Sequence, residues 1–235
     1  MIADERTIVS AKDDQKSMKF TASLTRMVHL VAIGLPVFII WLAKPGSSLF
    51  SWHPILMTFA FSFLMVEAIL MFSPHSSLMP TLPRATKAFW HWVLQTTAII
   101  LALIGFIVIF VNKNLHGKSH FVSWHGTFGL VVIILILVQA FQGVSVLYPK
   151  FNLLSKKLSE RKVLHALLGT LVFALGSATI VLGFFSNWFV KNSNEATWWG
   201  SVLSILAMTG VIMGQVVKEF EARKKSVKET VKEQK

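Results

Sequence analysis

The chain has 235 residues, of which 54% are hydrophobic and only 14% carry a charged side chain. A soluble domain has about a quarter of charged residues, so this composition excludes an ordinary soluble protein and indicates a membrane protein. The formal net charge of +12 would suggest nucleic-acid binding in a soluble protein, and the absence of cysteine excludes disulfides and cysteine-ligated zinc or iron–sulfur sites.

Six apolar stretches are long enough to cross a bilayer, which takes about 17–25 residues of helix. They cover residues 26–43, 52–73, 88–111, 122–147, 163–189 and 197–217. The connections are short and rich in Pro, Gly, Ser and Lys, so successive helices are expected to be antiparallel neighbours. The sequence therefore predicts an all-α polytopic membrane protein with six transmembrane helices. The membrane domain would cover residues 20–220, between a polar tail at 1–19 and a basic tail at 221–235.

The distribution of Lys and Arg predicts the orientation of these helices. With six spans, both termini share one side with the second and fourth connections, and this side holds all but four of the 23 basic residues. The exceptions are Lys44, Lys113, Lys118 and Lys191. Because basic connections stay in the cytoplasm, both termini are expected there. The net charge is then an orientation signal that also attracts anionic lipid, and nucleic acid is not expected as a partner.

Residues 1–19 lack the basic start, short apolar core and small-residue cleavage site of a secretory signal. The first apolar span is therefore expected to remain in the protein as a membrane helix.

Four histidines recur near the starts of the second to fifth spans. Ser51-Trp52-His53 opens the second span, and the same three residue types open the fourth as Ser123-Trp124-His125. The third and fifth spans carry His91 and His165 near their starts. In the predicted topology His53 and His125 lie near the non-cytoplasmic face, and His91 and His165 lie near the cytoplasmic face. The sequence thus predicts two depth-matched histidine pairs.

A pair of facing neutral imidazoles suits the two axial positions of a haem iron, and filling both positions favours electron transfer over oxygen chemistry. Zinc or copper would want further ligands, which neither depth offers. The second to fifth spans are therefore expected to form a central four-helix core around two haem groups. Glycines on the same helical faces either make room for a flat macrocycle or let the helices pack closely. They are Gly129, Gly169, Gly176 and Gly183.

Two other functions fit the same histidines. A histidine-lined transporter of metal ions or protons predicts a polar path between the two pairs, for which the sequence supplies only Glu67, Gln139 and Gln142. Glu67 itself could be protonated, could pair with either glutamine, or could accept the proton that accompanies an electron. A haem-free structural membrane protein is the third possibility. His29 lies outside the repeated pattern and is expected to be structural.

Basic residues at both ends of the core are candidate substrate sites. Arg84 and Lys87 precede His91, and a second cluster precedes His165; together they could steer an anionic reductant to the cytoplasmic pair. The second cluster comprises Lys157, Arg161 and Lys162. On the other side His116 and His120 lie in a connection with two lysines. This connection is either a polar loop at the lipid headgroups or a basic mouth for an anion or a chelated metal.

The stretch from Leu42 to Met71, the sequence HWVLQ from His91, GKSHFVSWHG around His125 and LYPK from Leu147 resemble the cytochrome b561 family. The resemblance covers about residues 20–220. It implies that His53 and His125 hold the non-cytoplasmic haem, and that His91 and His165 hold the cytoplasmic one.

The same resemblance implies ascorbate as the electron donor, monodehydroascorbate or ferric chelates as acceptors, and a homodimer. An endomembrane, in the endoplasmic reticulum or in endocytic or secretory vesicles, is expected rather than the plasma membrane. One feature differs, because better-known members have an arginine at the end of the second span. Residues 70–74 here contain no cation.

Overall fold

The computed structural model describes residues 5–73, 76–148, 150–151 and 157–233, and the side chains of those between 22 and 221. Within these residues all regular structure is helical, and six helices are long and apolar enough to cross a membrane. The predicted all-α polytopic fold is confirmed. The helices are α1 (Glu5–Ala43), α2 (Trp52–Thr58), η1 (Phe59–Leu64), α3 (Met65–Leu70), α4 (Arg84–Leu115), α5 (Trp124–Leu147), α6 (Leu158–Phe184), α7 (Asn187–Asn192) and α8 (Glu195–Glu233).

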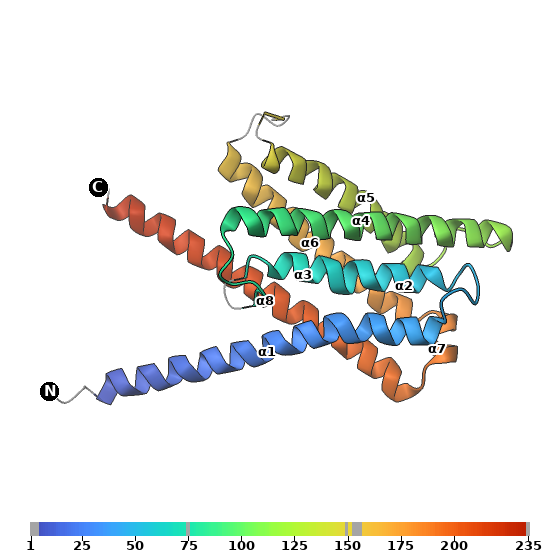
Figure 1. Cartoon of the computed structure of the whole chain (residues 1–235), viewed down its shortest axis with the longest axis horizontal. Helices are drawn as coiled ribbons and strands as arrows, with labels where there is room; N and C mark the ends of the chain where they lie inside the picture. Colours follow the sequence, from blue (N-terminus) through green and yellow to red (C-terminus); the bar gives the residue numbers. More distant parts are fainter. Residues whose placement is uncertain (1–4, 74–75, 149, 152–156, 234–235) are drawn as a thin grey trace.

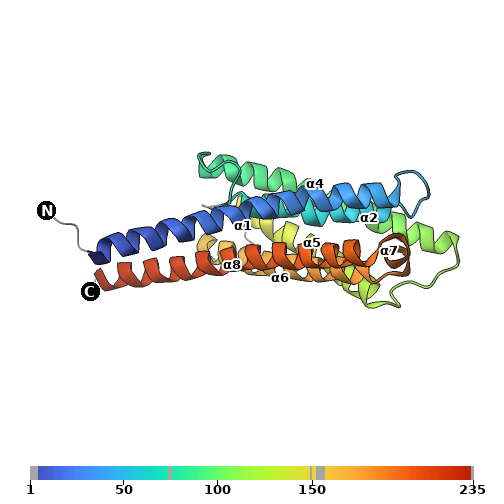
Figure 2. The same ribbon diagram turned by 90° about the horizontal axis from the view of Figure 1, so that it is seen from below.

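The long helices run roughly along one axis and alternate in direction (Figures 1 and 2). The N-terminus of α1 and the C-terminus of α8 lie at the same end of the bundle, here called the terminal end; α7 lies at the opposite end. Because α2 and α5 begin at the opposite end and α4 and α6 begin at the terminal end, the four histidines are divided between the two ends.

Several helices have different boundaries from those expected, among them α1, which begins at Glu5, and α8, which continues to Glu233. Two of the differences have a local cause. The helix expected at 88–111 runs from Arg84 to Leu115. It begins at Arg84 because the preceding residue, Pro83, has an extended backbone (φ −55°, ψ 148°) and lies outside the helix. The span expected at 163–189 ends at Phe184. There Ser186 accepts a hydrogen bond from the backbone N–H of Phe189 (3.3 Å) and starts the separate short helix α7.

The second span is not one regular α-helix. Residues Phe59–Leu64 form a π-helical segment, η1, between α2 and α3. A π-helical turn accommodates one residue more than an α-helical turn. The residues of α3 are therefore displaced by one position along the span relative to a continuous α-helix, and this displacement matters for the histidine partners described below.

A buried polar network holds α1 and α8 to the central helices. Nδ1 of His29 lies 2.7 Å from Oε1 of Glu67, and Nε2 of His29 lies 3.0 Å from the carbonyl oxygen of Ser76. The Ser76 hydroxyl accepts a hydrogen bond from the Gln215 amide (2.6 Å) and contacts the Thr25 hydroxyl (2.7 Å). Glu67 thus pairs with a histidine of α1, and this contact gives His29 the structural role expected from the sequence.

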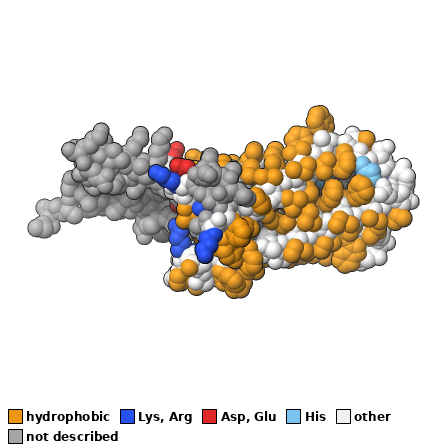
Figure 3. Space-filling view, turned by 90° about the horizontal axis from the view of Figure 1, so that it is seen from above, with side chains coloured by type: hydrophobic (Ala, Val, Ile, Leu, Met, Phe, Trp, Pro, Cys, Tyr) orange, Lys and Arg blue, Asp and Glu red, His pale blue; other side chains and the backbone are white. Residues whose placement is uncertain are grey.

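The outer surface of the bundle is largely apolar, as a lipid-facing surface requires. Figure 3 shows hydrophobic side chains over most of the body, with Lys and Arg gathered where the body meets the terminal end. Exposed aromatic residues include Trp41, Trp52, Trp92 and Trp124. Those near helix ends have the placement of an interfacial aromatic belt.

Candidate haem-binding site

His53 of α2 and His125 of α5 face each other at the end opposite the termini. Their ring centroids are 6.1 Å apart and the ring planes are nearly perpendicular, at 82°. His91 of α4 and His165 of α6 form the matching pair at the terminal end, with centroids 6.4 Å apart and planes at 77°. The structure therefore brings together the two pairs that the topology predicts.

These separations fit one metal held between two imidazoles. A metal–imidazole bond is about 2 Å long, so two rings that bind one metal from opposite sides have centroids roughly 6 Å apart. In the described part of the chain, no group of three or more His, Cys, Asp or Glu side chains could hold a metal ion. Each pair offers two nitrogens, and this donor set suits an iron whose four other ligands come from a macrocycle.

Backbone carbonyls fix the orientation of three of the four rings. Nδ1 of His53 lies 3.0 Å from the carbonyl oxygen of Gly105, and Nδ1 of His125 lies 2.9 Å from that of Thr179. Nδ1 of His91 lies 2.8 Å from the carbonyl oxygen of Ala68. A carbonyl can only accept, so each Nδ1 carries the proton and each Nε2 keeps its lone pair for a metal.

The helix start at Ser123 explains how one of these histidines is presented. The Ser123 hydroxyl accepts a hydrogen bond from the N–H of Gly126 (3.2 Å), which caps α5 and places His125 in its first turn. The equivalent Ser51 makes no such cap, because Pro54 occupies the third position and has no N–H. Ser51 instead donates to the carbonyl oxygen of Ser48 (2.7 Å).

The glycines make room for side chains of neighbouring helices. A Cβ added at Gly169 would lie 2.8 Å from Nε2 of Gln139, and one at Gly176 would lie 2.9 Å from the ring of Phe61. A Cβ at Gly183 would lie 3.2 Å from the His125 ring, whereas Gly129 has only an ordinary contact of 3.7 Å with a methyl group. Gly169 and Gly176 thus have the closest side-chain neighbours of the four glycines.

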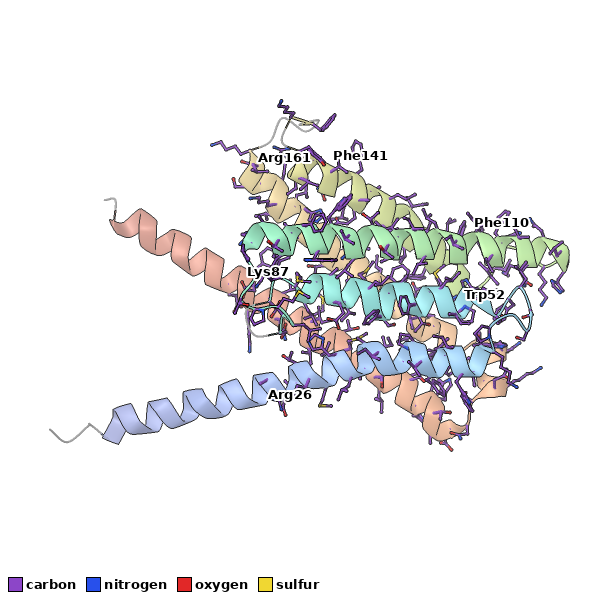
Figure 4. The ribbon with its side chains drawn as sticks, in the orientation of Figure 1. Arg26, Trp52, Lys87, Phe110, Phe141 and Arg161 are labelled. Atoms are coloured by element: carbon purple, nitrogen blue, oxygen red, sulfur yellow. The ribbon has the colours of Figure 1, made fainter. Side chains whose placement is uncertain are left out.

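At the terminal end, the ring of Phe72 lies between Arg84 and His91 of the His91–His165 pair. The guanidinium carbon of Arg84 is 5.9 Å from the centroid of Phe72, whose ring is 5.3 Å from that of His91. Lys87, one turn before His91, donates to the carbonyl oxygen of Pro80 (3.0 Å). Figure 4 shows Lys87 and Arg161 on the side of the termini and Trp52 at the opposite end.

Arg161 differs from its basic neighbours because it is buried. Its side chain is 3% exposed, whereas Lys157 and Lys162 are exposed. One guanidinium nitrogen donates to the carbonyl oxygen of Ser145, and Nε has no partner among the described residues. A buried guanidinium with unused donors, one turn before His165, is suited to an anionic group.

At the opposite end, the connection before α5 keeps its histidines near aromatic and polar neighbours. The His120 ring stacks on Phe110, with centroids 4.1 Å apart, and its Nε2 lies 2.7 Å from Oδ1 of Asn114. Nδ1 of His116 lies 2.7 Å from the carbonyl oxygen of Asn112. His120 is held in place beside the His53–His125 end of the bundle, while His116 is exposed.

Several residues that shape the site were not identified from the sequence. They are the carbonyl-bearing residues Ala68, Gly105 and Thr179, with Phe72 and Gly143. A Cβ at Gly143 would lie 3.2 Å from the ring of His165. One signal was present, because Gly105 follows His91 by the same 14 positions by which Thr179 follows His165.

Comparison with known proteins shows which family this chain resembles in sequence. Residues 52–190 match the model of the eukaryotic cytochrome b561 family. The chain is 45% identical to the transmembrane reductase CYB561D2 of Mus musculus over 84% of this chain and 88% of that protein. It is 36% identical to the probable transmembrane reductase CYB561D1 of Mus musculus, over 85% and 86% of the two chains. It is 27% identical to the plasma membrane ascorbate-dependent reductase CYBRD1 of Xenopus laevis, over 70% and 60%.

Proposed function

This chain belongs to the cytochrome b561 family, and from that premise we propose that it carries electrons across a membrane between two haem b groups. In this proposal ascorbate gives up electrons at the terminal end, which lies in the cytoplasm. Monodehydroascorbate or a ferric chelate accepts them at the opposite end. The proposal includes a homodimer, as the family resemblance implies, and a location in an endomembrane.

The observation that carries the proposal is the pair of facing histidines at each end. His53 with His125, and His91 with His165, would hold the two groups, each of which supplies reversible one-electron chemistry at iron when bound. The pairs are about 21 Å apart along the helices, because 14 residues at about 1.5 Å each separate His165 from Thr179, the partner of His125. Both pairs fit within the apolar thickness of a bilayer, about 30 Å.

The residues between the two pairs favour electron transfer over transport of ions or protons. Midway along the core the side chains of Phe61, Ala98, Ile136 and Phe173 are buried, and Phe61 packs against Gly176. A transporter needs polar groups along its path. Glu67 instead pairs with His29 on the side of α1, and Gln139 contacts His165. The packed apolar centre would exclude water and keep protons and metal ions from crossing.

The terminal end offers a basic surface for an anionic donor. Arg84 contacts Phe72, which adjoins the His91 ring, and therefore supplies a cation close to the position where residues 70–74 have none. Arg161, one turn before His165, supplies a second, buried cation. Lys87, Lys157 and Lys162 add positive charge around them. These five residues would bind and orient ascorbate, which is an anion at neutral pH.

At the opposite end, His116 and His120 with Lys113 and Lys118 would receive the acceptor. The Lys113 ammonium donates to the carbonyl oxygen of Ser119 (2.9 Å), which fixes the loop that carries His120. Both acceptors in the proposal are anionic or chelated by anionic groups, and a basic mouth attracts either.

The test is spectroscopic. Purified protein should show a reduced-minus-oxidised spectrum of low-spin b-type haem, with two haem groups per chain and reduction by ascorbate. His91→Ala should lower the content to one per chain and abolish electron transfer across vesicles, whereas His116→Ala should keep two. A haem-free spectrum of the folded wild-type protein would refute the proposal.

A further inference from the structure

His165 has a different environment from the other three histidines. For His53, His91 and His125, Nδ1 lies within 3.0 Å of a backbone carbonyl oxygen. Among the described residues, Nδ1 of His165 has no carbonyl acceptor, and its recorded polar neighbour is the side-chain amide of Gln139. The difference lies in the pair at the terminal end.

The internal repeat shows that Gln139 occupies the position that corresponds to Ala68. Ala68, the partner of His91, follows His53 by 15 positions, and Gln139 follows His125 by 14. The π-helical segment Phe59–Leu64 accounts for the additional residue in the first copy. At equivalent positions the first copy thus contributes a backbone oxygen, and the second contributes an amide group.

The amide of Gln139 packs directly against the His165 ring. Its Nε2 lies 3.1 Å from Nδ1 and 3.3 Å from Nε2 of the ring, and it donates to the carbonyl oxygen of His165 (2.9 Å). The Oε1 atom of Gln139 is buried with no partner among the described residues. The amide is therefore held with its N–H group toward the ring and its oxygen away from it.

Gly169 is what allows the amide to lie there. A Cβ at position 169 would be 2.8 Å from Nε2 of Gln139, closer than any stable contact. One turn after Gln139 along α5, Gly143 leaves room for the edge of the His165 ring, from which a Cβ would lie 3.2 Å away. Gly143, Gly169 and Gln139 thus pack closely around the side chain of His165.

A hydrogen bond from Nδ1–H to an acceptor makes an imidazole a more basic ligand and stabilises the ferric state of an iron that it binds. His165 lacks that bond, and the positive end of the Gln139 amide lies beside its ring. Both effects favour the reduced state. We infer that Gln139, positioned by Gly169, raises the reduction potential of the haem held by His91 and His165, so that this haem accepts electrons more readily. The inference rests on the proposed function.

Potentiometric titration of the purified, haem-loaded protein tests this inference. Gln139→Leu keeps the size of the side chain but removes its dipole. It should lower the equilibrium constant for reduction of one haem by about threefold to tenfold, where tenfold corresponds to about 59 mV for a one-electron couple. The other haem should keep its potential. Gly169→Ala, which displaces the amide without removing it, should shift the same haem in the same direction.

Gln142→Leu is the matched control, because Gln142 is the other glutamine of α5 whose buried Oε1 has no partner among the described residues. It should leave both potentials unchanged. The inference is overturned if Gln139→Leu and Gly169→Ala bind two haem groups with unaltered potentials, if the potential rises, or if both haems shift equally. If Gln139→Leu does not fold, Gly169→Ala decides. Absence of haem from the wild-type protein would instead overturn the proposed function.

Discussion

At the scale of single residues, the site depends on glycines placed at the edges of histidine rings. Gly143 adjoins His165 and Gly183 adjoins His125, and in each case an added Cβ would lie 3.2 Å from the ring. A branched side chain would push the ring away from its partner, and the pair could no longer bind one iron from both sides. Each glycine should therefore control one haem only.

Gly143→Val is expected to reduce the haem content from two per chain to one and to spare the His53–His125 site. Haem per chain, measured with the reduced-minus-oxidised spectrum, checks this result. Gly210→Val is the control, because nothing lies within 4 Å of a Cβ at Gly210, and this variant should retain both groups. Equal loss in the two variants would contradict a specific effect on His165.

The histidine pairing could be predicted because membrane topology assigns each histidine a depth, and two histidines at one depth on different helices can meet. The hydrogen-bond partners of their Nδ1 atoms could not be predicted. At Ala68 and Thr179 the partner is a backbone carbonyl, which every residue type has. Similarly, Gln139 looked like one member of a polar path, and its contact with His165 depends on the absence of a Cβ at Gly169.

At the scale of elements, the sequence predicted the number and order of the six spans, since each needs a long apolar run. It did not predict the π-helical segment at 59–64, because the sequence FAFSFL there contains no residue that breaks an α-helix. The separate helix α7 was also missed. Its apolar residues Trp188, Phe189 and Val190 extend the pattern of α6, while the cap at Ser186 ends it.

Attachment of α1 to α3 depends on the pair of His29 and Glu67, whose side chains are only 13% and 12% exposed. Glu67→Ala would leave His29 without its partner inside the bundle. Breaking such a buried pair costs about 3–5 kcal/mol, so the variant should unfold at a clearly lower temperature. The thermal midpoint in detergent, followed by circular dichroism, measures the effect.

A double-mutant cycle separates the pair from its surroundings. If the two side chains stabilise the fold through each other, His29→Ala combined with Glu67→Ala should lower the thermal midpoint by less than the sum of the single changes. Glu67→Gln keeps a hydrogen-bond acceptor for Nδ1 of His29. Its thermal midpoint should therefore lie between those of Glu67→Ala and the wild-type protein. Additive losses would show that the contact contributes nothing of its own.

At the scale of the whole molecule, the two ends of the bundle differ in charge more than in geometry. The histidine pairs are closely alike, with centroid separations of 6.1 and 6.4 Å, as expected for an internal repeat. The cations are not repeated at equivalent positions: Arg84 and Lys87 lie in the first turn of α4 and Arg161 near the start of α6, all at the terminal end, whereas Lys113 and Lys118 lie at the end of α4 and just after it, at the opposite end. Since both ends attract anions, the direction of electron flow would then follow from which substrate is present on each side of the membrane, together with the difference that Gln139 makes at His165.

Electrostatic attraction of an anionic donor predicts a dependence on salt. The Debye length falls from about 30 Å at 0.01 M ionic strength to about 8 Å at 0.15 M, so the exposed Arg84 attracts ascorbate over a shorter range in the more concentrated salt. The rate constant for reduction by ascorbate, measured by stopped flow, should therefore decrease across this range.

Arg84→Gln should react more slowly at low salt and show a weaker salt dependence, while haem content stays at two per chain. Because Lys118 lies at the opposite end, Lys118→Gln should behave as the wild-type protein does when ascorbate is supplied at the terminal end. A rate that is the same in Arg84→Gln and the wild-type protein at every ionic strength would place the donor site elsewhere.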